Sequence, residues 1–175
     1  FFFFSSRIRL PSSTRDSSSD VCSSDLGPPS FPCHAGATRW YLSPCTAFIT
    51  DAGYYMNLPD LDFIPGAAVM TRVISHPAKG VFTTDLGYKA IASDPAGQRG
   101  YIVGLEDAVP IIHSEEHWAF RLEDESRIPA IGTCLYVIPT HICPTTALYP
   151  EILVAKDGQV ADRWQVTARN RRITY

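Results

Sequence analysis

The sequence predicts a mainly β fold, either an antiparallel barrel or a sandwich, and three observations lead to that class. First, short runs of β-branched and aromatic residues are separated by Gly, Pro and Asp, as is typical of strands and turns. Second, apolar residues with a helical period are nearly absent. Third, two apolar-rich runs in residues 151–169 flank Asp157-Gly158, a dipeptide that suits a type I′ hairpin turn. Short strands joined by such turns favour an antiparallel barrel or sandwich.

The individual strands follow from these runs. Residues 133–139 alternate less cleanly than the others and are expected to form an interior strand. Residues 27–55 contain more Pro and Gly, which suggests a loop and a strand from a preceding domain, with a soft boundary near 59–66. The expected strands, besides the hairpin, are residues 45–51, 67–76, 80–85, 100–105, 109–120 and 133–139.

Composition limits the function classes. The chain has 175 residues, room for one ordinary domain or a small domain plus part of another. Apolar residues make up 45% and charged residues 19%, as expected of a folded, soluble domain. The formal charge of −3 and the lack of a large basic cluster argue against a nucleic-acid partner. No apolar run reaches the roughly 18 residues of a membrane span, so no membrane partner is expected.

The cysteines indicate a reducing compartment. They are odd in number and irregularly spaced, which argues against a disulfide framework, and no C-x-x-C is present. We therefore expect a cytoplasmic protein. The five cysteines are Cys22, Cys33, Cys45, Cys134 and Cys143.

Residues 1–26 differ from everything that follows. They are rich in serine and carry no period of a strand or a helix. A disordered tail is one interpretation. The interpretation that we favour is a translated sequencing adapter joined to a truncated reading frame, so the segment is disordered or artefactual and should have no packed structure. The polypeptide itself is then expected to begin near Gly27, inside a larger protein.

The segment "PTHICPTT" (139–146) carries the first candidate chemistry. If residues 140–143 are extended, His141 and Cys143 project from the same face, because side chains alternate along a strand. An imidazole nitrogen and a thiolate are a ligand pair that zinc accepts, but two ligands would make only an open site. The alternative is a hydrogen-bonded core histidine beside a cysteine that packs as a small apolar residue.

Two further clusters carry titratable groups. In residues 109–120, read as one strand, His113, Glu115 and His117 share a face and could form a carboxylate-supported site, or simply a solvated polar face. Asp85 precedes a Gly-containing turn and is most simply a turn former. Nothing around Lys89 indicates the desolvated pocket that a Schiff-base lysine needs.

Taken in order, several blocks resemble one family. It is the D-serine dehydratase and D-threonine aldolase group of enzymes that use pyridoxal phosphate (PLP), which are related to alanine racemase and have fold type III. The most diagnostic part is "SEEH" followed by "P-x-H-x-C-P-T". The matching stretches are residues 27–32, 42–55, 67–77, 84–94, 113–117, 138–149 and 162–173.

The resemblance implies an antiparallel β C-terminal domain over residues 63–175, preceded in 27–62 by a remnant of a (β/α)₈ barrel that holds the cofactor. His141 and Cys143 match the family's metal-binding pair, which would hold zinc or manganese. Gly27 and Ser30 match the end of a segment near the cofactor phosphate. Nearby polar side chains are expected to form hydrogen bonds with the metal ligands and so orient them. The candidates for these contacts are Asp85, Glu115, Glu116 and His117.

The barrel strand that bears the Schiff-base lysine has no match here, so the catalytic residues stay unassigned. The chain is therefore expected to be the C-terminal metal-binding fragment of a PLP-dependent lyase that acts on small D-hydroxy amino acids, and to be inactive alone. The intact enzyme is expected to be a homodimer. The alternative is a non-catalytic β-barrel interaction module in which the His and Cys are structural.

Overall fold

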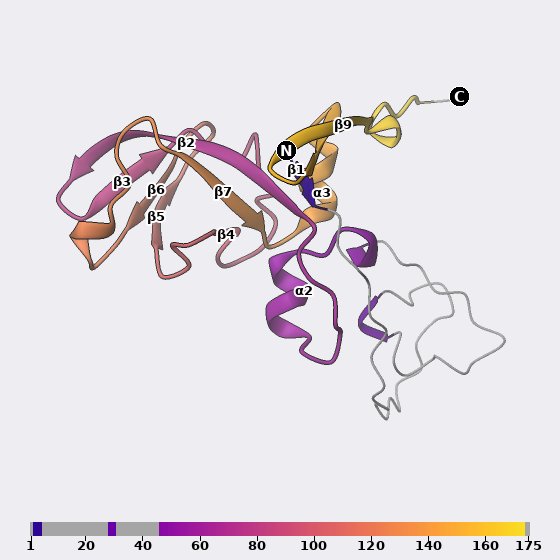
Figure 1. Ribbon diagram of the computed structural model, residues 1–175, viewed down its shortest axis with the longest axis horizontal. Coiled ribbons are helices and arrows are strands. Elements are labelled where there is room, and N and C mark those ends of the chain that lie inside the picture. The colour runs from indigo at the N-terminus through magenta and orange to yellow at the C-terminus, as the bar shows by residue number, and fades with distance from the viewer. Residues whose placement is uncertain (1, 5–27, 31–45, 174–175) are drawn as a thin grey trace.

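The computed structural model describes residues 2–4, 28–30 and 46–173, and it confirms a mainly β class (Figure 1). Helices are short, α2 at Ala52–Asn57 and α3 at Ile142–Ala147, with 3₁₀ turns at Pro28–Ser30, Thr46–Phe48, Glu125–Arg127 and Thr167–Arg169. No helix in these ranges is long and apolar enough to span a bilayer. The strands are β1 (Phe2–Phe4), β2 (Ala67–Ala78), β3 (Val81–Thr84), β4 (Gly100–Ile102), β5 (Val109–His113), β6 (Trp118–Arg121), β7 (Cys134–Pro139), β8 (Glu151–Lys156) and β9 (Gln159–Gln165).

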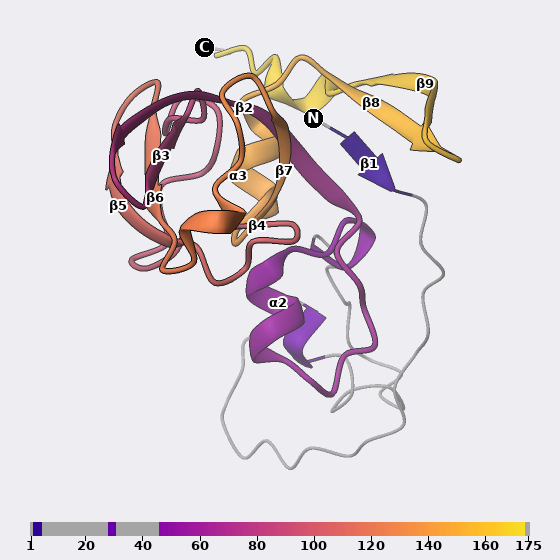
Figure 2. The same cartoon turned by 60° about the vertical axis from the view of Figure 1, so that its left-hand side comes forward.

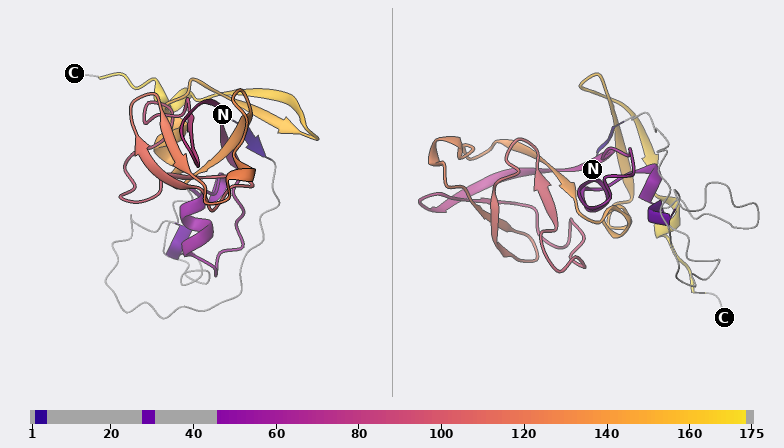
Figure 3. Two further views of the ribbon diagram at one scale, coloured as in Figure 1. Left: turned by 90° about the vertical axis from the view of Figure 1, so that its left-hand side faces the viewer. Right: turned by 90° about the horizontal axis from the view of Figure 1, so that it is seen from below.

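Six antiparallel strands form a curled sheet in the order β4-β7-β2-β3-β6-β5. Figures 2 and 3 show that this sheet bends round into an open half-barrel. The two ends of the order, β4 and β5, are not paired with each other, so a seam runs between them. β7 pairs with β2 on one side and β4 on the other, which confirms the expected interior strand.

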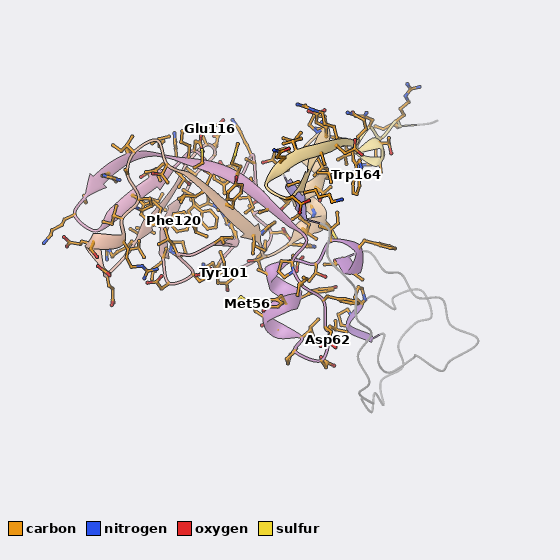
Figure 4. The ribbon with its side chains drawn as sticks, viewed as in Figure 1. Met56, Asp62, Tyr101, Glu116, Phe120 and Trp164 are labelled. Carbon is orange, nitrogen blue, oxygen red and sulfur yellow. The ribbon has the colours of Figure 1, made fainter. Side chains whose placement is uncertain are left out.

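Alternation along β2 explains which face of the curled sheet is inside. Val69, Thr71 and Val73 are buried, whereas the intervening Met70 and Arg72 are exposed. The buried side chains meet an aromatic group in which Trp118 and Phe82 flank Phe120, with ring centroids 4.6 and 5.5 Å away. Figure 4 shows Phe120 within the curled sheet. The buried core consists of Val69, Val73, Phe82, Leu86, Ile91, Ile102, Ala108, Trp118, Phe120, Leu122 and Val137.

The β8–β9 hairpin lies beside the curled sheet, and Trp164 marks it in Figure 4. Asp157 and Gly158 at its tip both have positive φ, 52° and 75°, as a type I′ turn requires, so the predicted turn is confirmed. Every residue of β9 is exposed. The buried part of the hairpin therefore comes from β8, where Ile152 is buried.

The expectation of no packed structure in residues 1–26 is wrong at Phe2–Phe4. These residues form β1, which pairs antiparallel with β2 and parallel with β8. The physical reason is that the two strands present backbone groups that an extended, aromatic-rich segment can satisfy. Residues 5–26 lie outside the described residues, so the rest of this expectation stays untested.

Two expected strands are wrong. Residues 46–51 form a 3₁₀ turn and the N-cap of α2, because the Asp51 carboxylate accepts from the Tyr54 amide. Residues 109–120 are two strands joined by a turn at 114–117, closed by the Ser114 amide donating to the His117 carbonyl over 2.8 Å. Four consecutive polar residues favour that turn over a continued strand.

Candidate metal site

His141 stands where β7 gives way to α3. It is the N-cap of α3, with extended φ and ψ of −133° and 104°, and Cys143 is already the second residue of the helix. The expected extension of residues 140–143 is therefore wrong after His141, and strand alternation does not relate the two side chains. Pro144 fits this first turn because its missing N–H would have no intrahelical partner there.

The His141 imidazole is oriented by a carboxylate from a distant loop. Its Nδ1 hydrogen-bonds to Asp94 Oδ2, and both side chains are about half exposed. The carboxylate accepts this hydrogen bond, so a proton lies on Nδ1, and in the neutral tautomer that this contact selects Nε2 has the free lone pair. This is the arrangement that a metal-binding histidine usually has. Asp94 was not among the candidate residues predicted from the sequence, although it ends the matching stretch 84–94.

The Cys143 thiol meets a hydroxyl from the segment before α2. Its Sγ lies 3.3 Å from Thr46 Oγ1, and Thr46 is buried. The contact joins α3 to residues that the sequence analysis assigned to the preceding domain. A thiol placed in this way could ligate a metal or serve only as a polar packing contact.

Asp51 links the two helices that border the site. Its carboxylate is 1% exposed and accepts from the Tyr54 amide and the Ile142 amide, each over 2.9 Å. It thereby caps α2 and α3 at once. Burial raises the pKa of the Asp51 carboxyl, while the two amide hydrogen bonds and nearby His141 act in the opposite direction. An Asp just before residues 52–57 was the sequence signal for this cap, and it was missed.

An open cavity of about 420 Å³ lies between α2 and the β7–α3 junction, and Cys143 is not among the residues that line it. Asp51, Asp94 and His141 contribute to its wall. In the described part of the chain, no three His, Cys, Asp or Glu side chains gather closely enough to hold a metal ion. His141, with its Nδ1 fixed, and Cys143 are suitable donors for part of a zinc site, which would need other ligands to complete it.

The carboxylates expected to support His141 lie elsewhere. Glu115 and Glu116 each place an oxygen 2.8 Å from Lys89 Nζ, so the expected contact to the imidazole is wrong. The loop at Gly87 lies so close to this turn that an added Cβ would be 1.9 Å from the Glu115 carbonyl oxygen. His117 is exposed in the same turn. Gly87 and Lys89 therefore pack against the 114–117 turn, whereas Asp94, at the end of the same matching stretch 84–94, contacts the His141 ring.

Asp85 has a structural contact instead of a metal-site contact. Its Oδ1 accepts from the Thr71 hydroxyl over 2.6 Å and from the Arg72 amide over 2.8 Å. These bonds tie the end of β3 to β2. No described contact joins Asp85 to His141 or Cys143.

None of the three lysines suits a Schiff base. Glu115 and Glu116 raise the pKa of Lys89 through their hydrogen bonds, whereas a Schiff-base lysine needs a lowered pKa. Lys79 is 85% exposed at its side chain, and Lys156 is exposed. Of the two residues expected near the cofactor phosphate, Ser30 lies in a 3₁₀ turn and Gly27 falls outside the described residues. The residues described here do not fit PLP attachment.

Comparison with known proteins supplies the family. The family model described as a putative serine dehydratase domain matches residues 66–155. An uncharacterized protein of Mycobacterium tuberculosis is 33% identical over 115 residues, covering 64% of this chain and 86% of that protein. The D-threonine aldolase of an Arthrobacter species is 31% identical over 124 residues, covering 68% of this chain and 31% of the aldolase.

A solved structure extends the likeness to the fold. The crystal structure of D-threonine aldolase from Filomicrobium marinum superposes with a TM-score of 0.73 at 26% identity, and the match covers 82% of this chain and 39% of that one. The chain thus spans less than half of either aldolase but most of the short mycobacterial relative. On these matches, the chain belongs to the family of the putative serine dehydratase domain, and its curled β-sheet has the fold of the matched part of D-threonine aldolase.

Proposed function

We propose that this chain is the C-terminal, metal-binding part of a PLP-dependent lyase that acts on D-hydroxy amino acids. The observation that carries the proposal is the His141–Asp94 contact at the edge of an open cavity, in a chain of this family. Relatives named D-threonine aldolase and 3-hydroxy-D-aspartate aldolase support the substrate class, since both names describe small D-amino acids with a β-hydroxyl. The proposed site is compatible with both dehydration and aldol cleavage of such a substrate.

In this proposal each residue has a defined task. His141 presents Nε2 to zinc or manganese, Cys143 supplies a thiolate, and Asp94 holds the proton on His141 Nδ1. Asp51 fixes the start of α3, and with it the backbone that carries both ligands. A bound metal would act as a Lewis acid toward a substrate hydroxyl, and PLP would withdraw electrons from the α-carbon. The other metal ligands would come from outside the described residues, and the PLP lysine from outside this sequence, because all of its lysines are described and none suits a Schiff base.

The proposal also covers the cellular compartment and the assembly of the intact enzyme. We place it in the cytoplasm, which agrees with the exposed thiol of Cys134. A homodimer remains the proposed assembly. The division into residues 27–62 and 63–175 stays part of the proposal; a small cluster outside the main core, Ala47, Leu61 and Phe63, contains residues from both sides of that boundary.

A second candidate is a non-catalytic interaction module with a structural His and Cys. The short mycobacterial relative favours it, because this domain alone fills 86% of that protein. The Cys143–Thr46 contact also fits a purely structural thiol. The two candidates differ in one measurable property, which is metal binding at His141 and Cys143.

Zinc affinity and stoichiometry of the purified chain distinguish them. With the metal reading, His141→Ala and Cys143→Ser should each weaken zinc binding by tenfold or more, and affinity should fall as the pH falls because the thiol must ionise. Cys134→Ser is the matched control, since Cys134 is an exposed free thiol on β7. Equal effects of the two cysteine substitutions, or no zinc binding by the unmodified chain, would favour the interaction module.

A further inference from the structure

A second cavity, of about 240 Å³, lies in the seam between the two ends of the curled sheet. Gly97 and Arg99, just before β4, line one side, and Pro110–His113 of β5 line the other. Buried Trp118 also contributes to the wall. The cavity exists because β4 and β5 do not pair, so the sheet stays open at this place.

Arg99 and His113 bridge the seam. Arg99 Nη1 donates to His113 Nδ1 over 2.6 Å, so Nδ1 carries no proton and the imidazole is neutral. The ring stacks on Trp118 with centroids 4.4 Å apart. Burial, and then the charge of Arg99, lower the pKa of His113 to about 4. The polar backbone groups of Leu86 and Gly87 raise this pKa, but by less. At neutral pH the histidine therefore adds no charge to the cavity.

Arg99 has no counter-ion among the residues that the structure describes. No described Asp or Glu oxygen lies within 4.0 Å of it, whereas Arg127 pairs with Asp107 and Arg163 with Glu151. Arg99 is also partly buried, which makes an unpaired guanidinium costly. Its Nε and Nη2 edge has no protein acceptor in the described ranges, so this edge can receive a ligand.

We propose that this seam binds a small carboxylate, held by the remaining edge of the Arg99 guanidinium. One positive charge beside a neutral imidazole matches one negative charge, and the planar guanidinium fork matches a planar carboxylate. The cavity volume limits the ligand to a small acid. The segment is also tied to the candidate metal site, because the Thr140 amide donates to the Arg99 carbonyl over 2.9 Å.

The test is an NMR titration of the chain with sodium acetate at pH 7, with sodium chloride exchanged to keep ionic strength constant. The Arg99 Nε–Hε signal and the His113 ring signals should shift and saturate at millimolar acetate. Inorganic phosphate, a tetrahedral anion, should bind at least threefold more weakly. Absence of a saturable shift in the unmodified protein would overturn the proposal whatever the variants do.

Two variants separate a site from general charge attraction. Arg99→Gln should weaken acetate binding at least tenfold while the amide spectrum stays dispersed. Arg121→Gln is the control, because Arg121 is exposed on β6 and its loss removes the same charge, so acetate affinity should stay within twofold. An equal response to acetate, phosphate and chloride, or an equal loss in both variants, would show charge attraction only and would refute the site.

Discussion

His113 and His141 both meet a charged side chain at Nδ1, but the charges have opposite sign. Arg99 donates to His113, which leaves the proton on Nε2, whereas Asp94 accepts from His141, which places the proton on Nδ1. His113 Nε2 is buried, and no hydrogen bond of normal geometry reaches it in the described part of the chain. The partner at one ring nitrogen thus decides what the other nitrogen can do.

The surroundings differ as much as the partners. His113 stacks on Trp118, a member of the main core, whereas His141 has a side chain that is 42% exposed at the cavity edge. One histidine is part of the packing of the curled sheet, and the other borders an open cavity. These two histidines therefore differ in partner and in surroundings, although the sequence offered both as candidate site residues.

The largest effect is expected from Trp118→Ala. This change removes the stacking partner of His113 and a side chain that is 1% exposed, so we expect a loss of about 3–5 kcal/mol in the free energy of unfolding. His141→Ala should change it by less than about 1 kcal/mol. Urea denaturation measures both. Similar losses of stability in the two variants would mean that the His141 side chain is packed in the core as Trp118 is.

Asp51→Asn should cost about 1–3 kcal/mol, because the amide NH₂ cannot accept the hydrogen bond that one carboxylate oxygen accepts now. A buried N–H at the start of α2 or α3 then loses its partner. Asp62→Asn is the control, since Asp62 is exposed in the following loop and labelled in Figure 4. Thermal and urea unfolding compare the two, and an Asp51→Asn protein as stable as the control would contradict the shared cap.

Acid should lower the free energy of unfolding in part through protonation of His113. The folded-state pKa of His113 is lowered to about 4 from 6.5, so its contribution to stability is complete above pH 6.5 and is lost as the pH falls toward 4. Allowing for partial exposure, this contribution is about 1–2 kcal/mol. Urea unfolding at pH 7 and pH 4.5 should show a larger acid loss in the unmodified chain than in His113→Gln. Equal losses would remove this distinction between the histidines.

The smallest effect on stability is expected from Asp94→Ala, under about 0.5 kcal/mol, because the contact is half exposed. Its signature is the His141 tautomer. Ring ¹⁵N shifts should show the proton no longer held on Nδ1, and zinc affinity should fall about tenfold. Asp94→Asn, whose amide oxygen can still accept, should restore the tautomer in part. An unchanged ring spectrum in Asp94→Ala would contradict the positioning role.

Local sequence determined much of the secondary structure. The β-branched run at 67–76 predicted β2, and Asp157-Gly158 predicted the hairpin turn, because strand propensity and positive φ are properties of a few adjacent residues. The ordered blocks also pointed to the correct family and fold. Local reading failed at residues 46–51, where β-rich composition concealed a helix cap, and at 114–117, where a polar turn was read as strand.

Only the tertiary structure decided how the candidate site is built. The Asp94 carboxylate reaches His141 from 47 positions away along the chain, and the Asp51 carboxylate reaches the Ile142 amide from 91. Arg99 reaches His113 only because the sheet curls and brings its unpaired ends together. Periodicity and turn chemistry act over a few residues, whereas these contacts depend on how the strands pair and bend, so no local pattern could show which carboxylate or cation each histidine would meet.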